Sequence, residues 1–275
     1  MRGLHKTTPI EKLISESKFL ADHGTKELIL IGQDTTDYGK DIYNKQNISE
    51  LIEKLSQINE IEWIRLMYAY PSHFPDDLIE TIAYNPKVCK YIDIPLQHIS
   101  DNVLKSMRRG ITQRRTKDLL YKLRERIPNL TLRTTFITGY PNETENDFKE
   151  LCNFVRDIKF ERFGVFTYSV EENTPAFILG DPIPQEVKEE RKAVLMEIQK
   201  EISTEKNNNL IGKEMKVLVD NIEEDYFIAR SERDAPEVDG EILIDKTESI
   251  EVGNFYSTKI YDCNEYDLFG KLNRV

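Results

Sequence analysis

The feature that most constrains the fold is a strand, a sharp turn and a helix start within residues 132–144, Leu-Arg-Thr-Thr-Phe-Ile-Thr-Gly-Tyr-Pro-Asn-Glu-Thr. Residues 132–138 are mostly apolar or β-branched, which is typical of a buried parallel strand. Gly139 and Pro141 break the strand, and Thr144 begins an amphipathic run that is typical of a helix. This order places Gly139 and Glu143 at the carboxyl end of a parallel strand, where α/β folds bind ligands. Whether Glu143 meets a ligand or only caps the following helix stays open.

The same alternation recurs along the chain. Strands are predicted at residues 27–33, 63–67, 91–94, 132–138 and 163–168. Helices are predicted before, between and after them, including residues 48–55, 76–83 and 116–126. Five strands alternating with helices predict a parallel, curved sheet, so the expected fold class is α/β, a partial (β/α) barrel. Because the chain begins with a helix, we expect the first strand of that barrel to be missing.

The pattern changes after residue 184. A long helix is predicted at about residues 185–206, with Val194, Leu195 and Ile198 on its apolar side. Short alternating strands follow at residues 215–219, 226–230, 241–244 and 255–261, which is typical of a small antiparallel barrel of roughly five strands. We therefore expect two domains, residues 1–207 and residues 208–275.

Composition narrows the function classes. The 275 residues carry a formal net charge of -11, and this sign disfavours broad, non-specific nucleic-acid binding without excluding a local basic patch. No signal peptide or membrane-spanning run is present, which indicates a cytoplasmic protein without a membrane partner. The three cysteines, Cys89, Cys152 and Cys263, are far apart in sequence, which fits neither a disulfide framework nor a metal motif.

Polar side chains follow several predicted strands, among them Gln33, Asp34, Gln97 and His98. None of them is specific alone, because polar residues are common in loops. His98 in particular is more often a capping or loop histidine than a catalyst. Arg133 differs because it lies within an otherwise apolar strand, where a buried arginine needs an anion. An internal salt bridge and a ligand carboxylate are equally open as that anion.

Several segments together carry a family resemblance. They are Gly-Gln-Asp-Thr-Thr at 32–36, Ile-Asp-Ile-Pro-Leu-Gln-His at 92–98, Met-Arg-Arg-Gly at 107–110, and the motifs at 133–144 and 166–171. In this order, over essentially the whole chain, they resemble the radical S-adenosylmethionine (SAM) methylthiotransferases. The C-terminal barrel resembles the small TRAM domain that ends these enzymes.

Two further segments, residues 33–38 and 230–240, are similar to the branch of that family that modifies an aspartate of small-subunit ribosomal protein twelve. The sister branch, which modifies an adenosine of transfer RNA, typically has Asn where Asp34 stands. From residue 208 onward the chain has 16 acidic and 8 basic residues, which suits a basic ribosomal protein better than RNA. The expected substrate-binding residues there are Arg230, Arg233, Glu237 and Asp239. A hairpin loop whose charges pair with one another is the alternative.

The resemblance implies an enzyme in which a four-iron four-sulfur (4Fe-4S) cluster cleaves SAM to a 5'-deoxyadenosyl radical. That radical would take a hydrogen from the aspartate β-carbon, where a methylthio group would be installed. The residues implied to contact SAM are Gln33 and Asp34 near its amino group, Arg133 near its carboxylate, Gln97 near the ribose or the substrate, and Phe136 and Gly139 near the adenine.

The chain also departs from the family. These enzymes hold one cluster on a CxxxCxxC loop and a second in an N-terminal domain, and cluster binding needs several convergent thiolates. The three cysteines lack that spacing, and residues 1–5 resemble the segment just downstream of the loop. We therefore expect a C-terminal fragment that keeps SAM contacts but lacks the cluster ligands and turnover. The alternative is a binding module that acts only through its acidic small domain.

Overall fold

The computed structural model describes residues 5–223, 225–246 and 250–272, so most of the N-terminal segment compared above lies outside the described residues. The chain divides into two compact units, Met1–Ile198 and Gln199–Val275. The boundary predicted after residue 207 falls near the end of helix α8 (Gln185–Asn208), whereas the two units divide within this helix.

The first unit is built on a parallel sheet of five strands. They lie in the order β1-β2-β3-β4-β5 and all pair in parallel. Their bounds are β1 (Glu27–Leu30), β2 (Trp63–Leu66), β3 (Val88–Asp93), β4 (Thr131–Thr138) and β5 (Arg162–Thr167). The predicted strands and their parallel arrangement are confirmed.

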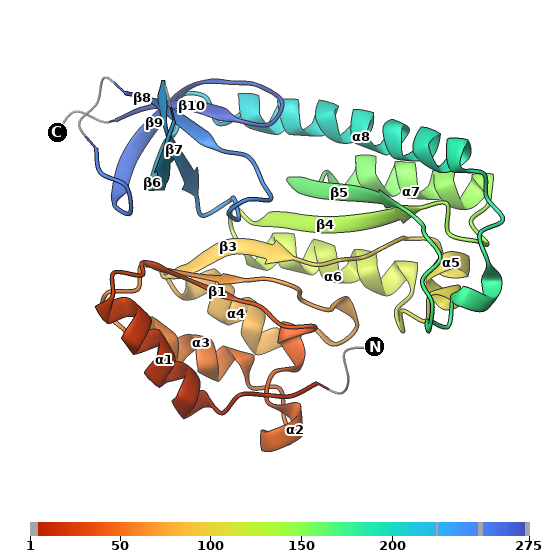
Figure 1. Cartoon of the computed structure of the whole chain (residues 1–275), viewed down its shortest axis with the longest axis horizontal. Helices are drawn as coiled ribbons and strands as arrows, with labels where there is room; N and C mark the ends of the chain where they lie inside the picture. Colours follow the sequence, from red (N-terminus) through yellow and green to blue (C-terminus); the bar gives the residue numbers. More distant parts are fainter. Residues whose placement is uncertain (1–4, 224, 247–249, 273–275) are drawn as a thin grey trace. The chain divides into compact units, whose positions relative to one another are not determined.

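Helices alternate with these strands, as Figure 1 shows. They are α1 (Ile10–Asp22), α2 (Lys40–Tyr43), α3 (Ile48–Ser56), α4 (Asp76–Tyr84), α5 (Asp101–Ser106), α6 (Gln113–Arg126) and α7 (Glu145–Ile158). Short 3-10 turns lie at Thr35–Asp37, Pro71–His73 and Phe177–Leu179. Helix α2 and these turns were not predicted, because elements of three or four residues are too short to show a hydrophobic period.

Strand β4 shows how the sheet separates its two faces. Leu132, Thr134, Phe136 and Thr138 are buried, while the alternate residues Arg133, Thr135 and Ile137 are half-buried. The Phe136 ring packs edge-on against Phe154 of α7 and against Phe160, with centroid distances of 6.3 and 5.8 Å. The buried set therefore faces the helices, and the half-buried set faces the other side of the sheet.

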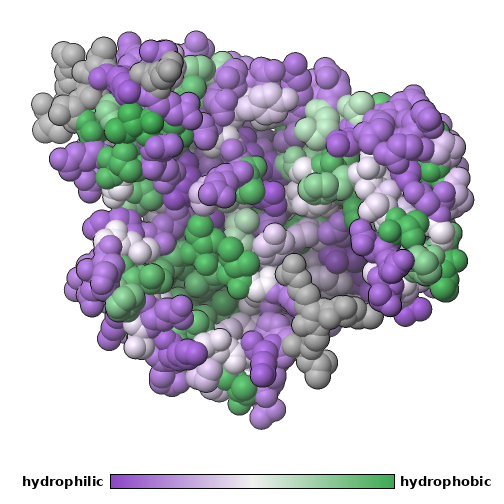
Figure 2. Space-filling model, in the orientation of Figure 1, coloured by the Kyte–Doolittle hydropathy of each residue, from purple (hydrophilic) through white to green (hydrophobic). Residues whose placement is uncertain are grey.

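Strand β1 forms one edge of this sheet. Figure 2 shows hydrophobic surface over α1 and β1, and a cavity of about 310 Å³ there is lined in part by Leu13, Leu20, Leu28 and Leu30. Among the described residues no helix is long and apolar enough to cross a membrane.

The second unit is a closed barrel in the order β10-β8-β7-β6-β9. Its strands are β6 (Glu214–Ile222), β7 (Tyr226–Ser231), β8 (Ile242–Asp245), β9 (Phe255–Cys263) and β10 (Leu268–Leu272). The prediction of a purely antiparallel barrel is wrong for one pair, because β8 and β10 run parallel. Directions cannot alternate all the way around a closed ring of five strands, so at least one neighbouring pair must be parallel.

The interior of this barrel is a continuous apolar cluster contributed by every strand. Its buried residues include Val217, Val219, Ala229, Ile242, Ile244, Ile260 and Leu268. Gly270 of β10 is required for this packing, because a Cβ there would lie 2.3 Å from Cγ2 of Thr258.

Replacing a core isoleucine should therefore destabilise the barrel far more than replacing an exposed one. Ile244→Ala, at a fully buried position, is expected to lower the free energy of unfolding of the barrel by about 2–5 kcal/mol. Ile222→Ala, at a position 45% exposed, should change it by less than about 1 kcal/mol. Amide hydrogen exchange of the β6–β10 amides measures both. Equal losses would contradict the assignment of this core.

Candidate functional site

The carboxyl ends of β3, β4 and β5 surround a cavity of about 330 Å³. Its wall includes Gln97, Met107, Arg109, Ile137, Tyr140 and Tyr168. Tyr140 and Tyr168 meet edge-on with ring centroids 5.2 Å apart and pack with buried Val103 behind them. A largely apolar cavity with a few polar groups at this end of a parallel sheet is typical of a ligand site.

Left-handed backbone conformations occur in the wall of this cavity, at Gln97 and Arg108, and just after β2 and β4, at Tyr68 and Gly139. Tyr68, Gln97, Arg108 and Gly139 have φ angles of 57°, 71°, 56° and 75°. A left-handed conformation costs about 1–2 kcal/mol in a non-glycine residue, and such strain clusters at ligand sites. Gln97 is held in it because its N–H donates to the carbonyl of Thr135 and its carbonyl accepts from Ile137 N–H, both at 2.8 Å. The wall is therefore preformed by β4.

The structure gives Asp34 a local role. Its Oδ1 accepts hydrogen bonds from Thr36 N–H at 2.9 Å and from the Thr36 hydroxyl, so it caps the turn at Thr35–Asp37. Thr35 N–H in turn donates to the carbonyl of Tyr68 at 3.1 Å, which ties this turn to the end of β2. Gln33 is exposed beside it. These contacts hold the loop at the carboxyl end of β1.

Arg133 has an internal partner. Its Nη1 lies 3.0 Å from Oδ1 of Asp93, whose side chain is fully buried. Oδ2 of Asp93 also accepts from Tyr68 N–H at 3.2 Å. Of the two alternatives, the structure contains the internal salt bridge, and the ligand carboxylate implied for Arg133 stays a prediction.

Phe136 does not present its ring to the cavity. The ring is fully buried among Phe154, Phe160 and Phe163 on the helix-facing side of β4. The ring therefore does not face the cavity, whereas the Phe136 backbone bridges to Gln97 in the cavity wall. The position near an adenine that the resemblance implies for Phe136 stays a prediction.

Gly139 sits where no side chain fits. Its φ is +75°, and a Cβ there would lie 2.1 Å from Cγ of Lys188. Lys188 of α8 is 1% exposed, and its ammonium donates to the carbonyl of Tyr168 at 3.0 Å and to Asp181 at 2.6 Å. The lysine stem thus lies directly on the turn that follows β4.

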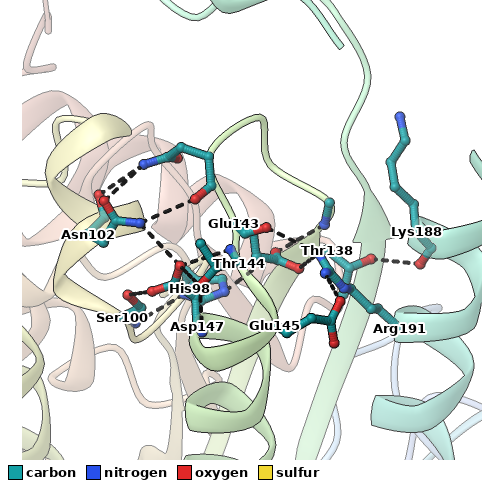
Figure 3. A network of polar contacts seen from close by, with 12 residues as sticks. His98, Ser100, Asn102, Thr138, Glu143, Thr144, Glu145, Asp147, Lys188 and Arg191 are labelled. Atoms are coloured by element: carbon teal, nitrogen blue, oxygen red, sulfur yellow. Dashed lines mark hydrogen bonds and ion pairs between the residues drawn. The ribbon is translucent and has the colours of Figure 1, made fainter. Parts of the chain in front are cut away.

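A buried carboxylate connects this turn to α8, as Figure 3 shows. Glu143 Oε2 accepts from Gly139 N–H at 3.0 Å, and Oε1 accepts from Arg191 Nη1 at 2.6 Å. Arg191 also pairs with Glu145. Glu143 is therefore not the helix cap left open above, because Thr144 and Asp147 form the capping box of α7. Removing one partner of such a buried pair costs about 3–5 kcal/mol.

His98 completes the network and is fully buried. Its Nδ1 accepts a hydrogen bond from Ser100 N–H at 3.0 Å, so we assign the proton to Nε2, which lies 3.5 Å from Oε2 of Glu143. Nε2 forms no hydrogen bond among the described residues, so His98 acts as a buried polar neighbour of Glu143 that is fixed by its bond to Ser100.

Lys188 and Arg191 were not predicted from the sequence, and Val194 was expected on the apolar side of α8. Lys188 and Arg191 are buried, whereas Val194 is 40% exposed. The signal that could have identified them is their spacing. Steps of three and four residues place positions 188, 191, 195, 198 and 202 on one face of the helix. Two basic residues at the start of an otherwise apolar stripe indicate buried ion pairs.

No thiolate cluster is present in the part of the chain that the structure describes. Cys89 and Cys152 are buried and Cys263 is half-buried, all as free thiols. The described residues contain no group of three or more His, Cys, Asp or Glu placed to hold a metal ion. These residues therefore do not fit a 4Fe-4S cluster.

In the second unit, the predicted substrate-binding loop is partly paired internally. Arg230 is 7% exposed, and its Nε lies 2.7 Å from Asp220. The Asp239 carboxylate accepts from Ala235 N–H at 2.9 Å. Glu237 is exposed and Arg233 is half-buried. Glu237 is thus the clearest surface charge of the four.

These features define a class of protein. Residues 1–155 match the Radical SAM superfamily and residues 211–272 match the TRAM domain. The chain belongs to the Radical SAM superfamily, and its C-terminal barrel is a TRAM domain. The fold also resembles coproporphyrinogen III oxidase (HemN) from Escherichia coli, a radical SAM enzyme, with a TM-score of 0.50 and 16% identity over 72% of this chain and 46% of that chain.

Relatives of higher identity carry one name, ribosomal protein uS12 methylthiotransferase RimO. The protein from Christiangramia forsetii is 52% identical over 98% of this chain and 60% of its own length. Those from Cytophaga hutchinsonii and Aquifex aeolicus are 51% and 46% identical, over 99% and 98% of this chain. This chain covers 62% and 63% of those two proteins, so it spans just over three fifths of the relatives it matches.

The packing of Lys188 on Gly139 predicts a specific loss of stability. Gly139→Ala must adopt a left-handed conformation and displace the lysine stem, whereas Gly110→Ala, with φ +67° and nothing within 4 Å of its Cβ, meets only the conformational cost. We expect Gly110→Ala to lower the free energy of unfolding by about 1 kcal/mol and Gly139→Ala by about 1–3 kcal/mol more. Urea unfolding compares them, and equal losses would refute the packing argument.

The capping box makes stability depend on pH. Burial alone would raise the pKa of Asp147, but hydrogen bonds from Ser100, Thr144 and Asn102 outweigh it and lower the pKa from 3.8 to about 2. Because the folded pKa is the lower one, this contribution is complete above pH 3.8 and is lost as pH falls towards 2. The stability difference between wild type and Asp147→Asn should therefore shrink across that window. Asp118→Asn, with a side chain 69% exposed, should show no such dependence in acid unfolding curves.

Proposed function

We propose that this chain is the SAM-binding and substrate-docking part of a methylthiotransferase that modifies an aspartate of ribosomal protein uS12. The observation that carries the proposal is the identity of 46–52% to relatives of that name over 98–99% of the chain. The cavity at the carboxyl ends of β3–β5 and the TRAM barrel support it, because a radical enzyme needs an enclosed ligand site and a docking surface for its protein substrate.

SAM supplies the radical that removes a hydrogen atom from the substrate in this chemistry. The described residues fit part of this ligand, since the cavity combines an apolar wall with the amide of Gln97. The Asp34 carboxylate lines the cavity beside β1 and is close enough to Arg109 to act on its pKa. We assign the ligand's ammonium group to Asp34, its ribose to Gln97 and its nucleoside edge to the backbone at Phe136 and Gly139. Gln33 lies beside the ammonium group in this assignment.

The protein positions this ligand and excludes water from it. The Glu143–Arg191 pair and the Lys188 stem hold the Gly139 turn rigidly, so groups that bind through this turn's backbone keep their places. Tyr140, Tyr168 and Met107 form the apolar wall that shields the reacting atoms. A rigid turn and a dry wall are what a radical intermediate requires, because loose geometry or water admits side reactions.

The reaction is tested on the complete gene product, reconstituted anaerobically with iron and sulfide and supplied with uS12, SAM, a sulfur source and a reductant. The expected product is uS12 in which one methylthio group replaces one hydrogen on an aspartate, measured by mass spectrometry of its peptides. Modification of a transfer RNA adenosine, with uS12 unchanged, would instead assign the chain to the RNA-modifying reaction.

The acidic surface of the TRAM barrel makes a separate prediction about docking. We expect this 275-residue chain to bind uS12 with an affinity that falls with added salt, because exposed charges are screened over about 10 Å at 0.1 M. Glu237→Lys should slow association, since charge acts mainly on the on-rate. Glu60→Lys, an exposed position in the first unit, is the control. Tighter binding of an anticodon stem-loop than of uS12 in the same titration would count against a protein substrate, and salt-independent binding would contradict the electrostatic argument.

A further inference from the structure

Arg109 lies in the wall of the cavity and is held there by uncharged groups. Its guanidinium lies 4.5 Å from the centroid of the Tyr70 ring, and its Nη2 donates to the carbonyl of Pro95 at 2.5 Å. The Tyr70 hydroxyl donates to the Arg109 carbonyl at 2.6 Å, which fixes the ring against the guanidinium. The side chain is thus positioned before any ligand arrives.

The charge of Arg109 is poorly compensated. The buried arginines Arg65 and Arg191 and the half-buried Arg133 each pair with a carboxylate, at 2.8, 2.6 and 3.0 Å. Arg109, in contrast, meets a ring and a backbone carbonyl in place of a carboxylate, and its buried Nε, like that of Arg191, has no hydrogen-bond partner among the described residues. Burial lowers the pKa of this guanidinium, and Tyr70 and Asp34 offset that effect only in part. A buried donor without an acceptor is costly, so its persistence at a cavity wall needs an explanation.

We propose that Arg109 is the anion-binding residue of this cavity and that its ligand is a carboxylate. A guanidinium matches a carboxylate in shape, because two parallel N–H groups can meet its two oxygens. The neighbouring wall of Met107, Ile137 and Tyr140 suits the short aliphatic stem that carries an amino-acid carboxylate. With Arg133 already paired to Asp93, Arg109 takes the role that the resemblance implied for Arg133.

This inference rests on the proposed function, which offers two sources for such a group. One is the methionyl carboxylate of SAM, and the other is the side chain of the target aspartate. Both are carboxylates on a short aliphatic chain, so Arg109 could receive either one, and paired ligands that differ only at that group distinguish them.

The first arm uses SAM and decarboxylated SAM, S-adenosyl-3-methylthiopropylamine, which keeps the ammonium and sulfonium groups and lacks only the methionyl carboxylate. Their dissociation constants are measured by NMR titration of this 275-residue chain, so the readout does not depend on a cluster or on turnover. If SAM supplies the carboxylate, wild type should prefer SAM by about tenfold, because a charge-assisted pair contributes about that factor. Arg109→Gln should abolish the preference, and Arg109→Lys should retain part of it.

The second arm compares uS12 with uS12 in which the target aspartate is replaced by asparagine. If the substrate supplies the carboxylate, wild type should prefer the natural protein by about tenfold and Arg109→Gln should bind both equally. Arg114→Gln is the matched control in both arms, because that side chain is 91% exposed on α6 and should leave every preference unchanged.

The outcomes separate the two proposals. Loss of a preference in Arg109→Gln, with an unchanged amide spectrum elsewhere, identifies the source of the carboxylate and supports the inference. If wild type binds these ligands and Arg109→Gln keeps every wild-type preference, the inference is overturned while the proposed function stands. If wild type binds neither SAM nor uS12, the proposed function itself fails, and the carboxylate sources named for Arg109 fail with it.

Discussion

The buried carboxylate of Glu143 is the interaction on which the cavity end of the first unit depends. It accepts the Gly139 N–H, lies beside His98 and pairs with Arg191 of α8. A lone carboxylate in this position would be costly to bury, so its partners offset that cost and hold the side chain in place. Glu143 therefore links three segments: the turn after β4, the segment after β3 and the start of α8.

That constraint explains why the turn after β4 tolerates so little variation. Gly139 must be left-handed to direct its N–H towards Glu143, and it must lack a side chain because the Lys188 stem occupies that space. The capping box of Thr144 and Asp147 then begins α7 immediately after the turn. Backbone groups in such a turn form a stiff surface for a ligand, whereas a turn held by one hydrogen bond would be mobile.

The distribution of arginines shows how the same residue type serves stability and binding. Arg65, Arg133 and Arg191 are each neutralised by a carboxylate inside the protein. Arg109 is stabilised by a ring and a carbonyl, which orient the guanidinium without cancelling its charge. A carboxylate partner offsets the charge of those three arginines, whereas the guanidinium of Arg109 has no such partner among the described residues, and this difference is the basis of the carboxylate-binding proposal.

Sequence by itself determined the alternation of strands and helices, the parallel sheet and the change to a small barrel near residue 212, because hydrophobic periods and turn residues are local properties. It also placed Gly139 and Gln97 at strand ends. Tertiary structure decided what those residues touch: that Arg133 pairs with Asp93, that the Phe136 ring faces the helices, and that Lys188 covers Gly139. It also decided that β8 and β10 run parallel. Partners distant in sequence and the direction of neighbouring strands are set by packing across the fold, and no local period records them.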